Sequence, residues 1–185
     1  MSGSEQVVKI TDSTATSDAL GLAALAVTTL TLAFWFFGQV SDIILVAMAL
    51  FAGGFTLYVA GVMAFKKGST FSTVTFGAFG VFWIGFAFIF IAPFGLEPAA
   101  KGMEIYYAIW GLLSAALMLG VIKLKARLLI AVFVALTVIL FALAVPLFVP
   151  VPAVVFGILA LILGLLSFYG AMAITLNEVG YKFPL

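Results

Sequence analysis

The side chains that could do chemistry within the long apolar stretches of this sequence are neutral hydroxyls and indoles. Thr28, Thr29, Thr75, Trp83 and Thr137 are the main candidates to line a path. Hydroxyl and indole N–H groups, together with exposed backbone, can line a narrow route for a small, weakly polar or protonated solute. For any one Ser or Thr, a hydrogen bond back to its own helix is the simpler interpretation. The set is therefore informative only if several members share one cavity.

Acid–base and metal chemistry are disfavoured by what the sequence lacks. The chain contains no Cys and no His, and its apolar stretches contain no Asp, Glu, Lys or Arg. A charge at the centre of a bilayer costs at least about 2.5–3.5 kcal/mol and is usually kept for function. We therefore expect no enzyme, no catalytic residue, no metal site and no cofactor, and neither a carboxylate relay nor a voltage sensor. The net charge of +1 predicts no attraction to nucleic acid.

One group of aromatic side chains has helical spacing. Phe76, Phe79, Trp83 and Phe86 recur at three- and four-residue steps and would form one bulky helix face. Core packing is the simpler interpretation, and the functional one is a hydrophobic constriction that excludes hydrated ions. Other aromatics near the ends of apolar stretches, such as Trp35 and Tyr107, are typical of interfacial anchors.

The elements that must position these residues are membrane-spanning helices. Hydrophobic residues make up 66% of the chain and charged residues 8%, against about 45–50% and about 25% in soluble domains. Because a span needs roughly 20 apolar residues and must satisfy its own backbone, the sequence predicts an all-α membrane protein with six transmembrane helices. Their expected ranges are 20–37, 43–65, 71–92, 105–122, 128–149 and 153–176, with a kink near Pro146.

The flanking segments are short and polar. Residues 1–19 are rich in Ser and Thr and are expected to form a disordered cytoplasmic tail. Residues 20–176 would form the six-helix transmembrane domain, and residues 177–185 a short cytoplasmic C-terminus. Glycines recur at helical spacing, and small residues of this kind predict close helix packing in lipid; they are Gly54, Gly61, Gly77, Gly80, Gly157, Gly164 and Gly170.

Positive charge predicts the orientation of the chain. Of the eight Lys and Arg residues, all except Lys101 fall before the first span, in alternate gaps or after the last span, namely Lys9, Lys66, Lys67, Lys123, Lys125, Arg127 and Lys182. Positive charge in short loops is retained on the cytoplasmic side. Both termini are therefore expected inside the cell, in a multi-pass protein of the cell (inner, cytoplasmic) membrane.

Several spaced motifs together resemble the acetate uptake transporter family, which comprises the bacterial acetate/succinate permeases and their fungal relatives. The most specific is the family stretch "KKG-x-TF…F-x-x-YG-x-FW", which matches Lys66 to Phe71 and Phe76 to Trp83. Further matches occur in the same order along nearly the whole chain, at Leu20-Gly21-Leu22, Thr28-Thr29, Trp110-Gly111, Ala126-Arg127, Leu136-Thr137-Val138 and Leu176-Asn177-Glu178.

This resemblance implies a hexameric ring with one pore per protomer in the lipid bilayer. It also implies passage of acetate and similar small monocarboxylates, by a channel-like route or in symport with protons. The family narrows its pore with an aromatic of helix 1, a Tyr of helix 3 and a Leu of helix 5. By motif position, these residues become Leu25, Phe79 and Leu136.

Departures from the family pattern mostly remove polar groups. Leu25 and Phe79 replace an aromatic and a Tyr, and the end of the first span reads Ala33-Phe34-Trp35-Phe36 where the family has Asn and His. We therefore expect a less polar pore, for which a larger or more apolar acid is a plausible cargo. Two alternatives remain: a channel for a small neutral solute (ammonia, urea or a short amide), and a non-transporting membrane assembly subunit.

Overall fold

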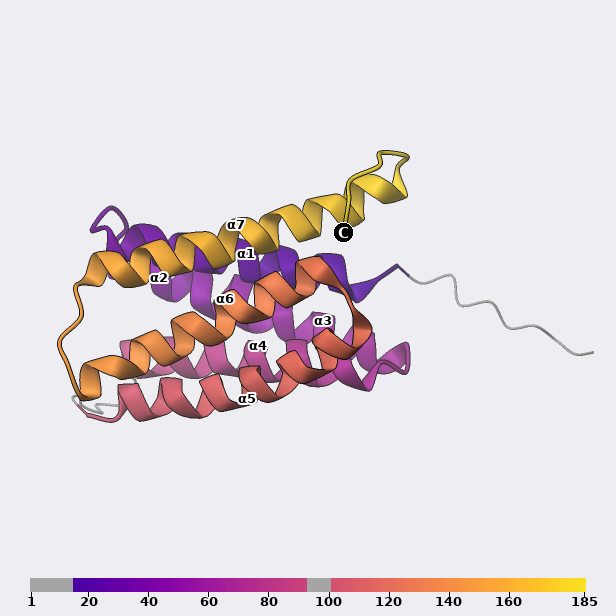
Figure 1. The fold of residues 1–185 in the computed structure, drawn as a ribbon. Coiled ribbons are helices and arrows are strands. Elements are labelled where there is room, and N and C mark those ends of the chain that lie inside the picture. Colours follow the sequence, from indigo (N-terminus) through magenta and orange to yellow (C-terminus); the bar gives the residue numbers. More distant parts are fainter. Residues whose placement is uncertain (1–14, 93–100) are drawn as a thin grey trace, which may run out of the picture.

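The protein folds as a bundle of long antiparallel helices, described by a computed structural model for residues 15–92 and 101–185 (Figure 1). Within these residues six helices are long and apolar enough to cross a membrane, which confirms the predicted all-α membrane fold. They run over Ser17–Phe36, Asp42–Lys66, Thr70–Ile91, Met103–Leu124, Arg127–Leu147 and Ala153–Glu178. The described residues contain no strand.

The helix starts follow local capping chemistry. Helix α1 (Ser17–Phe36) begins three residues before the expected span, because the Thr16 hydroxyl accepts a hydrogen bond from the Asp18 N–H at 3.3 Å. Ser69 caps α4 (Thr70–Ile91) in the same way, by accepting from the Ser72 N–H. Helix α5 (Met103–Leu124) follows a left-handed Gly102. Residues 1–14 of the predicted tail, including Lys9, lie outside the described residues.

The second span contains a segment that the sequence did not predict. It consists of α2 (Asp42–Met48), a π-helix η1 (Ala49–Thr56) and α3 (Leu57–Lys66). Within η1 the Thr56 hydroxyl donates to the Phe51 carbonyl five residues back. The Thr28 hydroxyl of α1 reaches the Met48 carbonyl at the start of this segment, at 3.4 Å. A π-segment of this kind is rare and needs a local cause.

Proline shapes the fifth span as predicted. Helix α6 (Arg127–Ala144) gives way to a short 3₁₀ turn η2 (Val145–Leu147) that contains Pro146. Since proline cannot donate the helical hydrogen bond, the regular helix ends at this point. Helix α7 (Ala153–Glu178) completes the bundle and packs most extensively against α1 (Figure 1).

Glycines allow the predicted close packing. A Cβ on Gly61 would lie 2.6 Å from the Gly77 backbone nitrogen, and one on Gly80 would lie 2.6 Å from the Tyr58 nitrogen. Helices α3 and α4 therefore touch through their backbones, which is how helices associate where lipid gives no hydrophobic drive.

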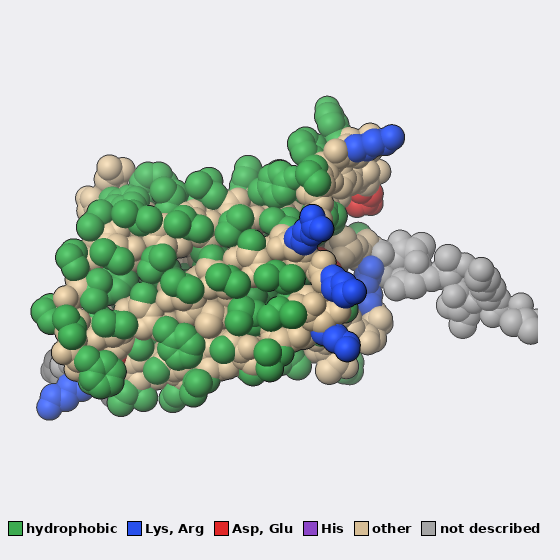
Figure 2. Space-filling model, viewed as in Figure 1, with side chains coloured by type: hydrophobic (Ala, Val, Ile, Leu, Met, Phe, Trp, Pro, Cys, Tyr) green, Lys and Arg blue, Asp and Glu red, His purple; other side chains and the backbone are tan. Residues whose placement is uncertain are grey.

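Charged side chains collect at the ends of the bundle. The alternating helix directions place Lys66, Lys67, Lys123, Lys125, Arg127 and Lys182 at the end that holds the start of α1 and the C-terminus. Figure 2 shows basic side chains gathered at this end and an apolar surface between the two ends. We call this end proximal and the opposite end distal.

Candidate functional site: two cavities that meet inside the bundle

A proximal cavity opens between the first halves of α1, α4 and α6. Its volume is about 360 Å³. Its polar wall residues are Asp18, Ser69, Ser72 and Thr75. The apolar wall consists of Leu22, Leu25, Leu57, Phe71, Phe76, Phe79, Leu124, Leu129, Val132, Phe133 and Leu136.

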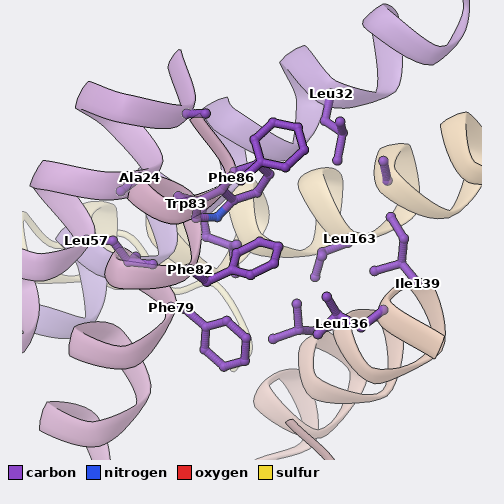
Figure 3. Packing of buried hydrophobic residues seen from close by; sticks show 14 of the residues in the cluster. Ala24, Leu32, Leu57, Phe79, Phe82, Trp83, Phe86, Leu136, Ile139 and Leu163 are labelled. Carbon is purple, nitrogen blue, oxygen red and sulfur yellow. The ribbon is translucent and has the colours of Figure 1, made fainter. Parts of the chain in front are cut away.

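A distal cavity of about 200 Å³ lies further along the same three helices. Aromatic and aliphatic side chains dominate its wall, which contains Thr29, Leu32, Trp35, Phe36, Phe79, Phe82, Trp83, Phe86, Phe90, Tyr107, Leu136, Ile139, Leu140, Leu143 and Leu163. Figure 3 shows Phe79, Phe82 and Phe86 on one side of this space, facing Leu136, Ile139 and Leu163 on the other.

The two cavities share Phe79 and Leu136. On α1 the boundary falls between Leu25, which lines the proximal cavity, and Thr29, one turn later, which lines the distal one. Helices α1, α4 and α6 run in the same direction, so residue numbers rise from the proximal to the distal cavity on all three. The cavities therefore follow one another along the bundle, with Phe79 and Leu136 between them.

The aromatic helix face predicted from the sequence forms a wall of both cavities. Phe76 lines the proximal cavity, Phe79 lines both, and Trp83 and Phe86 line the distal one. All four side chains are buried. Their three- and four-residue spacing therefore brings them onto one interior face of α4.

Two of the proposed lining threonines lie in the cavities. The Thr29 hydroxyl donates to the Leu25 carbonyl at 2.7 Å, so it presents an already paired group to the distal cavity. The buried Thr75 hydroxyl in the proximal cavity has no hydrogen-bond partner. Thr75 therefore has an unused hydrogen-bonding group in the path.

The other two threonines of the prediction, Thr28 and Thr137, lie outside both cavities. Thr28 is fully buried, and its hydroxyl donates to the Ala24 carbonyl at 2.9 Å. The Thr137 hydroxyl is hydrogen-bonded to Ser114 of α5 at 2.8 Å. Thr137 therefore links α6 to α5, whereas Thr28 bonds within α1 and reaches the Met48 carbonyl of the second span at 3.4 Å. The residues that line the cavities are one helical turn apart, Leu25 and Thr29 on α1 and Leu136 and Leu140 on α6.

Two aromatics interpreted as interfacial anchors, Trp35 and Tyr107, also line the distal cavity and are half-buried. Trp35 lines the cavity, and its indole N–H donates to Asp42 Oδ1 at 2.7 Å. Tyr107 also lines the cavity from α5. The neighbouring Tyr106 hydroxyl donates to the Phe82 carbonyl at 2.6 Å, which fixes α5 against α4. Their positions near span ends gave no signal that they also line a cavity.

The electrostatics of the path are set by the absence of cationic side chains from its walls. No Lys or Arg is among the described residues that line either cavity. The described residues also contain no group of three or more His, Cys, Asp or Glu that could hold a metal ion. The arrangement can sort solutes by size, hydrogen bonding and hydration.

Comparison with known proteins gives consistent matches in sequence and structure. The sequence model of the GPR1/FUN34/yaaH family matches residues 4–183. The succinate-acetate/proton symporter SatP of Escherichia coli (strain K12) is 34% identical over 165 residues, covering 86% of this chain and 87% of SatP. A protein of Methanothermobacter thermautotrophicus is 32% identical over 153 residues, covering 75% of this chain and 73% of its own.

A solved structure described as that of the bacterial acetate channel SatP superposes with a TM-score of 0.85. It is 32% identical to this chain, and the match covers 93% of this chain and 98% of that one. These matches confirm the resemblance drawn from the spaced motifs.

Proposed function

The chain belongs to the GPR1/FUN34/yaaH family, and on this premise we propose that it moves acetate or a related small monocarboxylate across a membrane. Relatives that cover most of its length are named for succinate–acetate/proton symport and for an acetate channel. The observation that carries the proposal is the pair of cavities that meet at Phe79 and Leu136. The relatives are named for transport, and we propose no enzymatic role.

The narrow point of the path is assigned to Leu25, Phe79 and Leu136. Two of these side chains border both cavities, and Leu25 lies on the proximal side of the same level. All three are at least nine-tenths buried, with 8%, 3% and 6% of their surfaces exposed. Thr29, Thr75, Phe76 and Trp83 line the path on either side.

Protons travel with the substrate in this proposal. A carboxylate that passes Phe79 and Leu136 without a cationic partner would lose hydration that nothing replaces. The undissociated acid avoids this cost. Uptake therefore behaves as acid entry or as proton symport, without an ionisable residue in the spans.

We place both termini in the cytoplasm and the protein in the cell membrane, because six of the described basic residues lie at the proximal end. We also propose the hexameric ring, with one path per protomer, that the family resemblance implies. Native mass spectrometry of the purified protein tests the ring, and a mass other than that of six chains would contradict it.

The function is tested by labelled-acetate uptake into proteoliposomes at several external pH values. Uptake above that of empty liposomes should rise as the pH falls. Leu136→Trp should reduce this flux strongly, since it fills the level where the cavities meet. Val138→Trp is the control, because Val138 is on the same helix, 47% exposed and outside both cavities. Uptake equal to that of empty liposomes at every pH would refute the proposal.

A neutral solute such as ammonia, urea or a short amide is the second candidate cargo. The observation that favours it is the absence of Lys and Arg from the described cavity walls. Swelling of proteoliposomes in urea and in acetate separates the two cargoes. The cavities at the level of Thr29, Phe79 and Leu136 disfavour the alternative of a non-transporting assembly subunit. In such a subunit side chains would fill the interior of the bundle at this depth.

A further inference from the structure

The distal cavity has the walls of an apolar binding site. Phe79, Phe82 and Phe86 present aromatic rings to it, and Leu136, Ile139 and Leu163 face them from α6 and α7 (Figure 3). Each of these side chains is more than nine-tenths buried in the bundle. Alkyl groups that enter such a space leave water, which favours binding roughly in proportion to the apolar area removed.

The cavity is larger than acetate requires. Its volume is about 200 Å³, whereas a cavity of about 150 Å³ lined by Leu, Ile and Phe is known to take up benzene. A two-carbon acid would leave much of this wall without contacts. A longer alkyl chain would fill it.

Few polar groups in the cavity are free to bind a solute. The Thr29 hydroxyl and the Trp35 indole already donate, to the Leu25 carbonyl and to Asp42. The Trp83 indole and the Tyr107 hydroxyl line the cavity and donate to no other described residue. These two donors are the remaining ones in the described wall, so a monocarboxylate could use both, whereas each carboxyl group of a dicarboxylate would have at most one.

The charge state of the bound acid follows from the surrounding groups. Tyr107 is the titratable residue in the described wall, and α1, α4, α6 and α7 contribute none there. Asp42 reaches the cavity only through Trp35, and it carries the same sign of charge as a carboxylate. An ionised carboxylate would therefore be desolvated without an opposite charge, at a cost that the neutral acid avoids.

We propose that the distal cavity binds aliphatic monocarboxylic acids of about four to six carbons, as undissociated acids, in preference to acetate and to dicarboxylates. The proposal rests on the proposed transport function and assigns the substrate class to the same path. Burial of a methylene predicts an affinity gain of about fourfold per added carbon. Affinity should fall about tenfold per pH unit once the pH exceeds the pKa of the free acid, which is about 4.3 for an aliphatic carboxyl group such as that of Glu.

The test is calorimetric titration of the detergent-solubilised full chain at pH 5 with acetate, propionate, butyrate, pentanoate and succinate. Affinity should rise from acetate to pentanoate, and succinate should neither bind measurably nor compete with butyrate. Ile139→Trp should remove the chain-length gain, because it fills the cavity, while Val138→Trp on the same helix should keep it. Partition of the acids into the detergent micelles is the same for both variants, so the difference between the two variants reports binding to the cavity.

The proposal is overturned if the unaltered protein binds acetate as tightly as butyrate, if succinate competes with butyrate, or if Ile139→Trp keeps the chain-length gain. Labelled-acetate flux of the same protein, after reconstitution into liposomes, separates this failure from failure of the proposed function. Acetate flux together with binding that shows no chain-length preference would leave transport in place and remove the substrate assignment. Graded binding without flux would keep the assigned site and remove the transport function.

Discussion

The proximal and distal cavities lie along the same three helices but differ in chemistry. The proximal cavity contains the hydroxyls of Ser69, Ser72 and Thr75 and the carboxylate of Asp18. At the distal level aromatic and aliphatic side chains make up most of the wall, and its polar groups are the Thr29 and Tyr107 hydroxyls and the Trp35 and Trp83 indoles. A solute that moves between them therefore exchanges hydroxyl and water contacts for apolar ones.

One face of helix α4 supplies most of the side chains that make the two cavities differ in polarity. Its proximal turns carry Ser72 and Thr75, and its distal turns carry Phe82, Trp83 and Phe86. Phe79 lies between these two sets. A single helix therefore makes the path asymmetric, and the point at which a solute must lose its water coincides with the level where the cavities meet.

Removal of the partition between the cavities should have the largest effect. Phe79→Ala joins the two spaces, and we expect higher flux of acetate and entry of urea. The buried ring also packs against Trp110, with ring centroids 5.9 Å apart. Its loss should reduce the free energy of unfolding by about 3–5 kcal/mol. Liposome swelling and unfolding in a denaturing detergent measure the two effects.

Phe88→Ala is the matched control, because Phe88 is on the same helix and 49% exposed. It should leave urea excluded and change stability far less. If Phe79→Ala excludes urea as well as the unaltered protein does, the two cavities are not separated by this ring.

Displacement of Trp83 into the distal cavity should have an intermediate effect on stability and on butyrate binding. A Cβ on Gly53 would lie 2.7 Å from Trp83 Cγ and 2.8 Å from Thr28 Cγ2, so Gly53→Ala forces the indole to move. Overpacking of this kind costs about 1–3 kcal/mol. We expect weaker butyrate binding and little change in acetate binding.

Gly77→Ala is its control, since a Cβ there would meet nothing within 4 Å. That variant should keep the binding of both acids, and its helix should gain about 0.5–1 kcal/mol from the loss of a mid-helix glycine. Equal loss of butyrate and acetate binding in Gly53→Ala would contradict the difference assigned to the distal cavity.

The sequence predicted the features that follow from length, charge and helical spacing. The six spans agree with the structure to within a few residues, because a span is recognised from one run of apolar side chains. Phe79 and Leu136 were proposed for the constriction by motif position; both line each of the two cavities, and the constriction itself stays a prediction. The inward face from Phe76 to Phe86 followed from its three- and four-residue steps.

Features that depend on contacts between helices could not be predicted in this way. The π-segment at Ala49–Thr56 coincides with the packing of Trp83 against Gly53, two residues far apart in the sequence. Thr137 and Thr29 have the same side-chain chemistry, yet Thr137 is hydrogen-bonded to Ser114 and Thr29 faces a cavity. Helix rotation decides such cases, and neighbouring helices set that rotation.

The smallest predicted effect compares a hydroxyl in the path with one between helices. Thr137→Val leaves the buried Ser114 hydroxyl without its partner at 2.8 Å, so it should destabilise the bundle by about 0.6–1.7 kcal/mol. Thr75→Val instead removes a buried hydroxyl that has no partner, so stability should stay constant or rise by up to about 1 kcal/mol. In acetate flux the order should reverse, because only Thr75 lines the path. Unfolding in denaturing detergent and labelled-acetate uptake on both variants test this crossed pattern. If Thr137→Val slows flux more than Thr75→Val does, the path runs closer to α5 than the two cavities indicate.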